Sequence, residues 1–261
     1  MIAAWRLHLR LEGDGEIRFR HVRALIASLV ERDATAAAHH GNVKAYTVSP
    51  LGLHDQGRGW FDITTLTDSA ARSLFTGVAA ARTGPQLHLG PRSVRLADEP
   101  ILLERTSFSK LREQPPARRV HLRFASPVMF LHGRREQTSF PLPGLVTGHH
   151  RARWHAFAPE ADALDLDLKR LRPQVAAFEG RSASVADSFR RNGRFIDRRL
   201  VGYLGEVTYE ATTDEVPLLR AWQAVSSFAR FCGTGANTTM GLGVTVPLTD
   251  TAAVAATEGT A

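Results

Sequence analysis

A five-residue pattern occurs twice in this chain, and its two copies lie far apart. Leu7-His8-Leu9-Arg10-Leu11 matches Val120-His121-Leu122-Arg123-Phe124, with apolar side chains at alternate positions and basic ones between them. An alternation with a period of two is typical of a β-strand that buries one face. Pro115-Pro116-Ala117 directly precedes the second copy and suits a linker. The repeat therefore predicts a chain built from two similar units.

The elements expected after each copy follow the same order. The first unit is predicted to contain a strand, a helix, two strands, a helix and a strand, at 5–11, 21–31, 43–50, 59–65, from Asp68 onward, and 92–104. The second is predicted to repeat this order at 119–131, 141–156, 164–168, 203–210, from Pro217 onward, and 244–248. That order is the ferredoxin-like unit. We therefore predict an α+β fold of two tandem ferredoxin-like (RRM-like) domains with antiparallel sheets.

The predicted boundaries are residues 1–115 for the N-terminal domain and 118–248 for the C-terminal domain. Residues 249–261 are small and polar, so we expect a flexible tail. Residues 179–199 show little periodicity and are expected to form a long loop.

The charge of the chain is basic and unevenly distributed. It carries 33 Lys and Arg against 26 Asp and Glu, a net charge of +7. Residues 118–155 and 181–199 contribute +6 and +4, which favours a surface that binds a polyanion. The single cysteine, Cys232, excludes an internal disulfide and a Cys-rich zinc module. No apolar run is long enough to span a membrane, so we expect a cytoplasmic protein with no membrane partner.

The segment after the first predicted helix holds residues suited to acid–base chemistry. His39 and His40 exchange protons near neutral pH, and the nearby Lys44 can stabilise charge that develops on a phosphate. RNA cleavage by its own 2′-OH needs only a base, an acid and such a cation. From spacing alone, the favoured interpretation is that these residues are solvated groups at a helix C-terminus and not catalytic groups.

A glycine-rich segment joins the last predicted helix to the last strand. Its glycines allow close backbone approach, and its Thr and Asn side chains offer neutral hydrogen bonds to phosphate or ribose. It lacks the Gly-Lys-Ser/Thr ending of a P-loop. The segment is predicted to bind RNA through Gly233, Gly235, Asn237, Thr238, Thr239, Gly241 and Gly243.

Two further features have simpler interpretations. His149, His150 and His155 could suggest a metal site, but a basic helix face is the favoured interpretation, since no Cys or paired acid accompanies them. Cys232 reads as a small buried residue.

These features together resemble a known family. The tandem ferredoxin-like order, the Lys44-Ala45-Tyr46-Thr47-Val48-Ser49-Pro50-Leu51 segment and the Gly-rich segment before the last strand resemble the CRISPR-associated endoribonucleases of the RAMP superfamily. Proteins of that family process precursor CRISPR RNA. In the family a histidine after the first helix does acid–base work, which corresponds here to His39 or His40, and a lysine corresponding to Lys44 assists it.

The chain departs from the family at two places. Many relatives have proline where Ala45 stands, and some carry a tyrosine in the first helix, whereas here no tyrosine precedes Tyr46. The second catalytic proton is therefore left to Tyr46 or to the other histidine.

The resemblance implies metal-independent cleavage within CRISPR repeats, leaving a 2′,3′-cyclic phosphate and a 5′-hydroxyl, with no cofactor. It implies repeat RNA as the partner, a CRISPR effector complex as a further one, and a monomer or homodimer. RNA binding is expected from Arg118, Arg119, Arg123, Arg190, Arg191, Arg194, Arg198 and Arg199. The alternative is a non-catalytic RNA-binding RAMP subunit of an effector complex.

Overall fold

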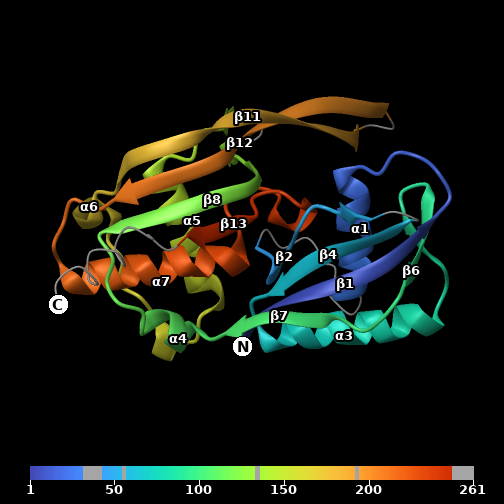
Figure 1. Ribbon diagram of the computed structural model, residues 1–261, viewed down its shortest axis with the longest axis horizontal. Helices are drawn as coiled ribbons and strands as arrows, with labels where there is room; N and C mark the ends of the chain where they lie inside the picture. Colours follow the sequence, from blue (N-terminus) through green and yellow to red (C-terminus); the bar gives the residue numbers. More distant parts are fainter. Residues whose placement is uncertain (32–42, 55–56, 133–135, 192–193, 249–261) are drawn as a thin grey trace, which may run out of the picture.

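The computed structural model describes residues 1–31, 43–54, 57–132, 136–191 and 194–248. Within those ranges the chain forms two large antiparallel sheets, each accompanied by helices, and one small two-stranded sheet (Figure 1). No helix in these ranges is long and apolar enough to cross a membrane. His39 and His40 lie outside the described residues, as does the predicted tail at 249–261.

The N-terminal sheet is organised around its first strand. The sheet has the order β2-β4-β1-β6-β5, with β3 paired to β4 and β7 paired to β1. The strands are β1 (Ile2–Glu12), β2 (Tyr46–Val48), β3 (Gly52–Leu53), β4 (Arg58–Thr65), β5 (Leu87–Leu89), β6 (Arg92–Leu96) and β7 (Ile101–Thr106). The alternating Leu7, Leu9 and Leu11 are buried beneath α1 (Phe19–Val30) and α3 (Asp68–Thr83), which pack against each other. The predicted alternation thus places β1 at the centre of the sheet.

The C-terminal sheet repeats this arrangement with β8 (Arg119–Val128) in the central position. Its order is β11-β12-β8-β13, formed with β11 (Gln174–Arg191), β12 (Arg194–Glu210) and β13 (Thr245–Leu248). The helices α5 (Pro143–Phe157) and α7 (Val216–Cys232) pack together and contribute buried side chains to its core. In both sheets the first strand of the unit lies between the third and the fourth, so the predicted mixed fold with antiparallel sheets is confirmed.

Short elements complete the second half. A small hairpin is formed by β9 (Phe130–His132) and β10 (Glu136–Thr138). The remaining helices are α4 (Phe108–Arg112), η1 (Glu160–Asp162), α6 (Leu168–Leu171) and η2 (Thr238–Met240).

Two predictions about the second half are wrong. Residues 179–199 are not a loop, because β11 and β12 pair from Gln174↔Glu210 to Arg191↔Arg194 and form a long two-stranded ribbon. Residues 164–168 form no strand, since the chain there runs from η1 into α6 and buries Leu166 and Leu171. The sequence did not predict the ribbon because apolar periodicity indicates burial against a core, whereas this ribbon is held together by backbone pairing.

The two sheets share buried contacts. Ile2, Ala4 and Leu66 from the N-terminal half belong to the same apolar cluster as the core of the C-terminal half. The Thr47 and Thr64 hydroxyls both donate to the carbonyl oxygen of Phe231 near the end of α7, at 3.1 and 2.5 Å. These contacts bring the end of α7 against β2 and β4. The division into domains at residues 115–118 stays a prediction.

Candidate active site around the end of the first helix

A buried carboxylate at the end of α1 connects two of the predicted site residues. Lys44 Nζ donates to Glu31 Oε2 at 3.0 Å, and the Tyr46 hydroxyl donates to Glu31 Oε1 at 2.6 Å. The side chains of Lys44 and Glu31 are only 14% and 9% exposed. The structure therefore brings Lys44 and Tyr46 together through a residue that the sequence analysis did not single out.

Burial and the adjacent carboxylate change the chemistry of Tyr46. The side chain belongs to the apolar core of the N-terminal half and is 3% exposed. Desolvation, the hydrogen bond to Glu31 and its negative charge raise the pKa of Tyr46 far above its usual value, while Arg23 acts in the opposite direction. The phenol is consequently a proton-bearing donor to Glu31 at every physiological pH.

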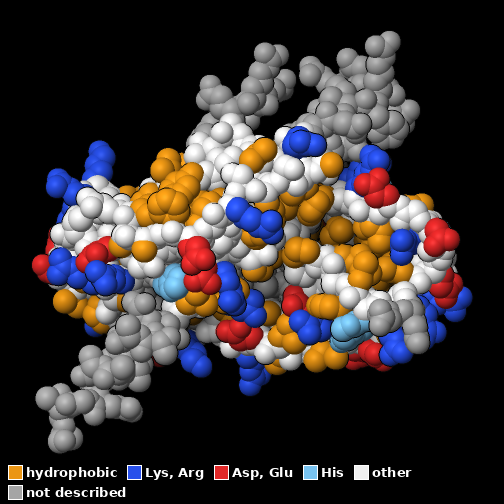
Figure 2. Space-filling view, turned by 45° about the horizontal axis from the view of Figure 1, so that its top comes forward, with side chains coloured by type: hydrophobic (Ala, Val, Ile, Leu, Met, Phe, Trp, Pro, Cys, Tyr) orange, Lys and Arg blue, Asp and Glu red, His pale blue; other side chains and the backbone are white. Residues whose placement is uncertain are grey.

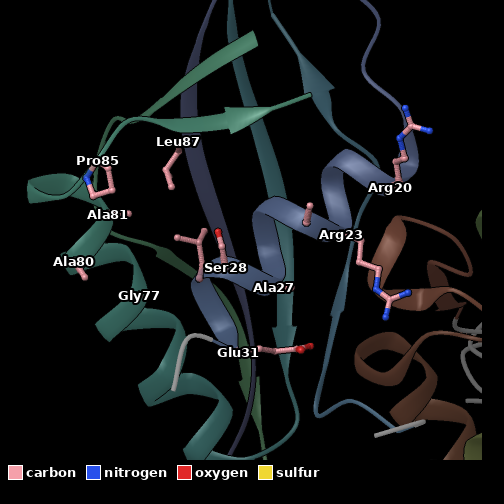
Figure 3. A pocket seen from close by; sticks show the side chains of 12 residues that line it. Arg20, Arg23, Ala27, Ser28, Glu31, Gly77, Ala80, Ala81, Pro85 and Leu87 are labelled. Carbon is pink, nitrogen blue, oxygen red and sulfur yellow. The ribbon is translucent and has the colours of Figure 1, made fainter. Parts of the chain in front are cut away.

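Figure 3 shows the orientation of α1 at this place. Arg23 and Glu31 project from the same side of the helix, away from α3. A surface groove of about 720 Å³ lies beside α1 and is lined largely by apolar residues of α1, of α3 and of the chain from Pro85 to Leu87. Arg20, Arg23 and Glu31 also line this groove, so the carboxylate that accepts from Lys44 and Tyr46 borders it.

The Gly-rich segment lies directly against the Lys44–Leu51 segment, although almost 200 residues separate them in sequence. Gly241 has a φ of +92°, and a Cβ atom there would lie 3.2 Å from Pro50 Cα and from the Ser49 carbonyl oxygen. A side chain at this position would therefore push the two segments apart. This contact unites the two motifs that carried the sequence resemblance.

Most of the Gly-rich segment is built into the protein rather than presented to solvent. Gly233, Gly235, Thr234 and Thr238 are buried, and a Cβ at Gly235 would lie 2.3 Å from the Met129 carbonyl oxygen. Gly241 and Gly243 are buried as well, whereas Asn237 and Thr239 remain partly exposed. The tight glycine positions are thus explained by the chain's own backbone, and Asn237 and Thr239 are the members of the predicted set that reach the surface.

The prediction of a basic helix face around His149 and His150 is wrong. His150 is 1% exposed, and its Nε2 lies 2.7 Å from the Thr234 hydroxyl, which is also 2.7 Å from the Thr245 hydroxyl. Burial lowers the pKa of His150 well below its usual value, and burial with the charge of Arg153 lowers that of His149 to about 3. Both rings are therefore neutral at pH 7, and His150 anchors the Gly-rich segment.

No metal site is found where the structure gives side-chain positions. Within the described ranges, no three His, Cys, Asp or Glu side chains are grouped in a way that could hold a metal ion. Cys232 is fully buried as predicted, and burial raises the pKa of its thiol to about 12.

The arginines predicted to bind RNA fall at different places along the C-terminal sheet. Arg119 pairs in register with Glu210, the last residue of β12, and its side chain lies 3.2 Å from that carboxylate. Arg118 lies 2.7 Å from Asp214, and Arg123 is exposed on β8. A second group, here called the ribbon arginines, lies toward or at the opposite end of β11 and β12 and consists of Arg190, Arg191, Arg194, Arg198 and Arg199.

Strand length shows how far apart these groups are. The strand β12 begins at Arg194 and ends at Glu210, and its 17 residues correspond to roughly 50 Å of strand. The ribbon extends past β8 toward the part of the molecule that contains α1 (Figure 1). On the face drawn in Figure 2, basic side chains outside the grey residues are interspersed with acidic ones rather than gathered in a single patch. The end of the ribbon that carries the sequence positions of the ribbon arginines is therefore the end nearer α1 (Figure 1).

An aromatic residue on the exposed sheet face was missed by the sequence analysis. Trp60 on β4 is stacked by His54, with ring centroids 4.5 Å apart, and Arg6 lies over its ring at 5.5 Å. Arg6 is held there by Asp62, to which it donates at 2.7 and 2.9 Å. The sequence did contain a signal for Trp60. Phe61 and Ile63 face the core, so the alternation of β4 places Trp60 and Asp62 on the other face of the sheet. Glu31 had no such signal, since its role depends on residues 13 and 15 positions later.

Comparisons with known proteins agree with this arrangement. A family model described as "CRISPR-associated endoribonuclease Cas6" matches residues 122–245. Two Cas6 product complexes are similar over 95% of this chain. The first has a TM-score of 0.73 at 26% sequence identity, and the match covers 99% of its own chain. The second has a TM-score of 0.72 at 24% sequence identity, and the match covers 100% of its own chain. Thermus thermophilus Cas6 gives a TM-score of 0.64 at 25% identity, over 95% of this chain and 98% of that one. No curated protein matches by sequence. The predicted resemblance is confirmed.

Proposed function

We propose that this chain, which resembles the Cas6 endoribonucleases in its C-terminal sequence and over its whole fold, cleaves precursor CRISPR RNA within the repeats. The observation that carries the proposal is the contact between the Lys44–Leu51 segment and the Gly-rich segment at Gly241. It is supported by the likeness to Cas6 proteins whose structures were solved as product complexes.

In the proposed reaction the RNA supplies its own nucleophile. A base removes the proton of a 2′-hydroxyl, and the resulting oxygen attacks the adjacent phosphorus. The bond to the 5′-oxygen breaks, and an acid protonates that leaving oxygen. The products are a 2′,3′-cyclic phosphate and a 5′-hydroxyl, and the balance of the reaction requires no metal ion.

His39 or His40 acts as the general acid or base, and Lys44 stabilises the charge of the phosphorane. The histidines are five and four residues from Lys44, so covalent geometry limits the Cα separations to at most roughly 18 and 14 Å. We assign Tyr46 a positioning role, because its buried hydroxyl donates to Glu31 and its raised pKa opposes proton transfer. The second proton is then assigned to the other histidine.

The test is cleavage of an end-labelled repeat RNA in EDTA, with identification of the product ends. The double variant His39→Ala/His40→Ala is expected to lose about 10²–10⁴ in rate, the usual contribution of a general acid or base. His155→Ala, which removes an exposed histidine of α5, is the matched control and should cleave normally.

A substrate with a single 2′-deoxy nucleotide at the cleavage position should bind and remain intact. If the double histidine variant cleaves at the wild-type rate, the catalytic assignment fails. If the wild-type protein binds the RNA without cutting it, the chain is instead a non-catalytic RNA-binding subunit. Loss of activity in EDTA would indicate a metal-dependent reaction.

A further inference from the structure

We infer that Glu31 is a positioning residue for the cleavage reaction, which orients the Lys44 ammonium toward the scissile phosphate. This inference rests on the proposed function and assigns a role to a residue that no sequence motif includes. Glu31 acts through Lys44 and is not itself placed at the reacting atoms.

The carboxylate is fixed from two directions. Glu31 follows the last residue of α1 as its C-cap, and its backbone N–H donates to the Ala27 carbonyl oxygen at 2.8 Å, so the last turn of the helix fixes its backbone. Each of its two oxygens then accepts a different donor, Lys44 on Oε2 and Tyr46 on Oε1. A carboxylate with both oxygens engaged cannot rotate without losing a bond.

Tyr46 supplies the rigid side of this arrangement. Its ring is buried in the N-terminal core, and its backbone pairs in register with Thr65 of β4. Lys44 stands two positions earlier, just before β2 begins, and its ammonium donates to the other oxygen of the same carboxylate. The core thus holds Tyr46, Tyr46 holds the Glu31 carboxylate, and the carboxylate holds the ammonium of Lys44.

The consequence for catalysis follows from the properties of lysine. Its side chain has four rotatable carbon–carbon bonds, and its ammonium has three N–H donors. An orienting partner reduces the number of side-chain positions that must be searched when the phosphate arrives. Misplacement of a catalytic group by about 1 Å can cost roughly 100-fold in rate. Loss of Glu31 should therefore lower the rate of the chemical step while the RNA remains bound.

The experiment is a double-mutant cycle measured by single-turnover cleavage at saturating protein. Glu31→Gln keeps an acceptor for Tyr46 but removes the negative charge that faces Lys44, and we expect it to slow cleavage by about 10- to 100-fold. Lys44→Met should also slow cleavage. The variant with both changes should be no slower than Lys44→Met alone, because the contribution of Glu31 passes through Lys44.

The controls separate positioning from folding. The RNA dissociation constant and the melting temperature are measured for each variant, and Glu104→Gln, which disrupts a surface pair with Arg230, should cleave as the wild type does. Glu31→Asp retains the charge with a shorter reach and should give an intermediate rate, even if Glu31→Gln does not fold.

Two results would overturn the inference. One is wild-type cleavage by Glu31→Gln or, where that variant does not fold, by Glu31→Asp. The other is a double variant slowed by the product of the two single effects, which would indicate independent roles. If the wild-type protein itself fails to cleave repeat RNA, it is the proposed function that fails.

Discussion

Replacing Gly241 by alanine tests whether the contact between the Gly-rich segment and the Lys44–Leu51 segment supports activity. The φ of +92° at this residue is one that L-amino acids rarely adopt, and such strain costs of the order of 1–3 kcal/mol. The added Cβ would also lie 3.2 Å from Pro50 Cα and from the Ser49 carbonyl oxygen, closer than an ordinary contact. We therefore expect a free energy of unfolding lower by about 1–3 kcal/mol.

For a chain of this size, each kcal/mol corresponds to roughly 2–4 °C, so the melting temperature should fall by about 2–12 °C. The assay is thermal unfolding followed by circular dichroism, combined with single-turnover cleavage well below the melting temperature. Because the displaced backbone at Ser49 and Pro50 directly follows β2, cleavage should slow even where the variant is fully folded.

Gly144→Ala provides the matched control. Gly144 lies in the first turn of α5, and a Cβ there would have no neighbour within 4 Å. Alanine at that position should stabilise the helix by about 0.5–1 kcal/mol and leave cleavage unchanged. If Gly241→Ala melts and cleaves as Gly144→Ala does, the contact is not a structural requirement and the reasoning is refuted.

Two further predictions concern RNA binding and acid stability. Changing all ribbon arginines to glutamine should weaken binding of repeat RNA and reduce the slope of log affinity against log salt by roughly 0.7–0.9 per lost phosphate contact. Arg118→Gln/Arg119→Gln should change the slope less, since both side chains face carboxylates, and equal changes per arginine would contradict the assignment. His149 has a folded pKa of about 3 against an unfolded value near 6.5, so the unfolded state binds its proton first and stability falls as the pH drops below 6.5. Between pH 7.5 and 5 the free energy of unfolding should fall by about 2 kcal/mol through this residue, and His149→Phe should remove that loss. If the melting temperature of the variant falls between the two pH values by as much as that of the wild type, the ring is not held neutral by burial.

The ribbon of β11 and β12 shows what local patterns leave out. Val185 and Leu200 are buried in it, but many of its other described residues are exposed, so no alternation marks it as a strand pair. Its register is held by backbone hydrogen bonds, which every sequence can form. Loop and ribbon were therefore indistinguishable from the sequence.

His150 and Glu31 illustrate a second limit. Each is a titratable residue on or directly after a helix, and sequence alone favours exposure for both. The burial of His150 depends on its partner Thr234, and that of Glu31 depends on Lys44 and Tyr46. The fold brings these partners from other elements. A titratable side chain changes character when it is desolvated, and only the packing decides where that happens.

The sequence by itself determined the first strand and the two main helices of each unit, and the two segments that carry the family resemblance. These are properties of local periodicity and of short motifs, because a half-buried strand or helix repeats its apolar residues at its own period. The tertiary structure alone decided that Gly241 lies against Pro50, that Glu31 holds Lys44 and Tyr46, and that the ribbon extends past β8. Those contacts join residues distant along the chain, and their energies depend on burial and on pairing that no single segment encodes.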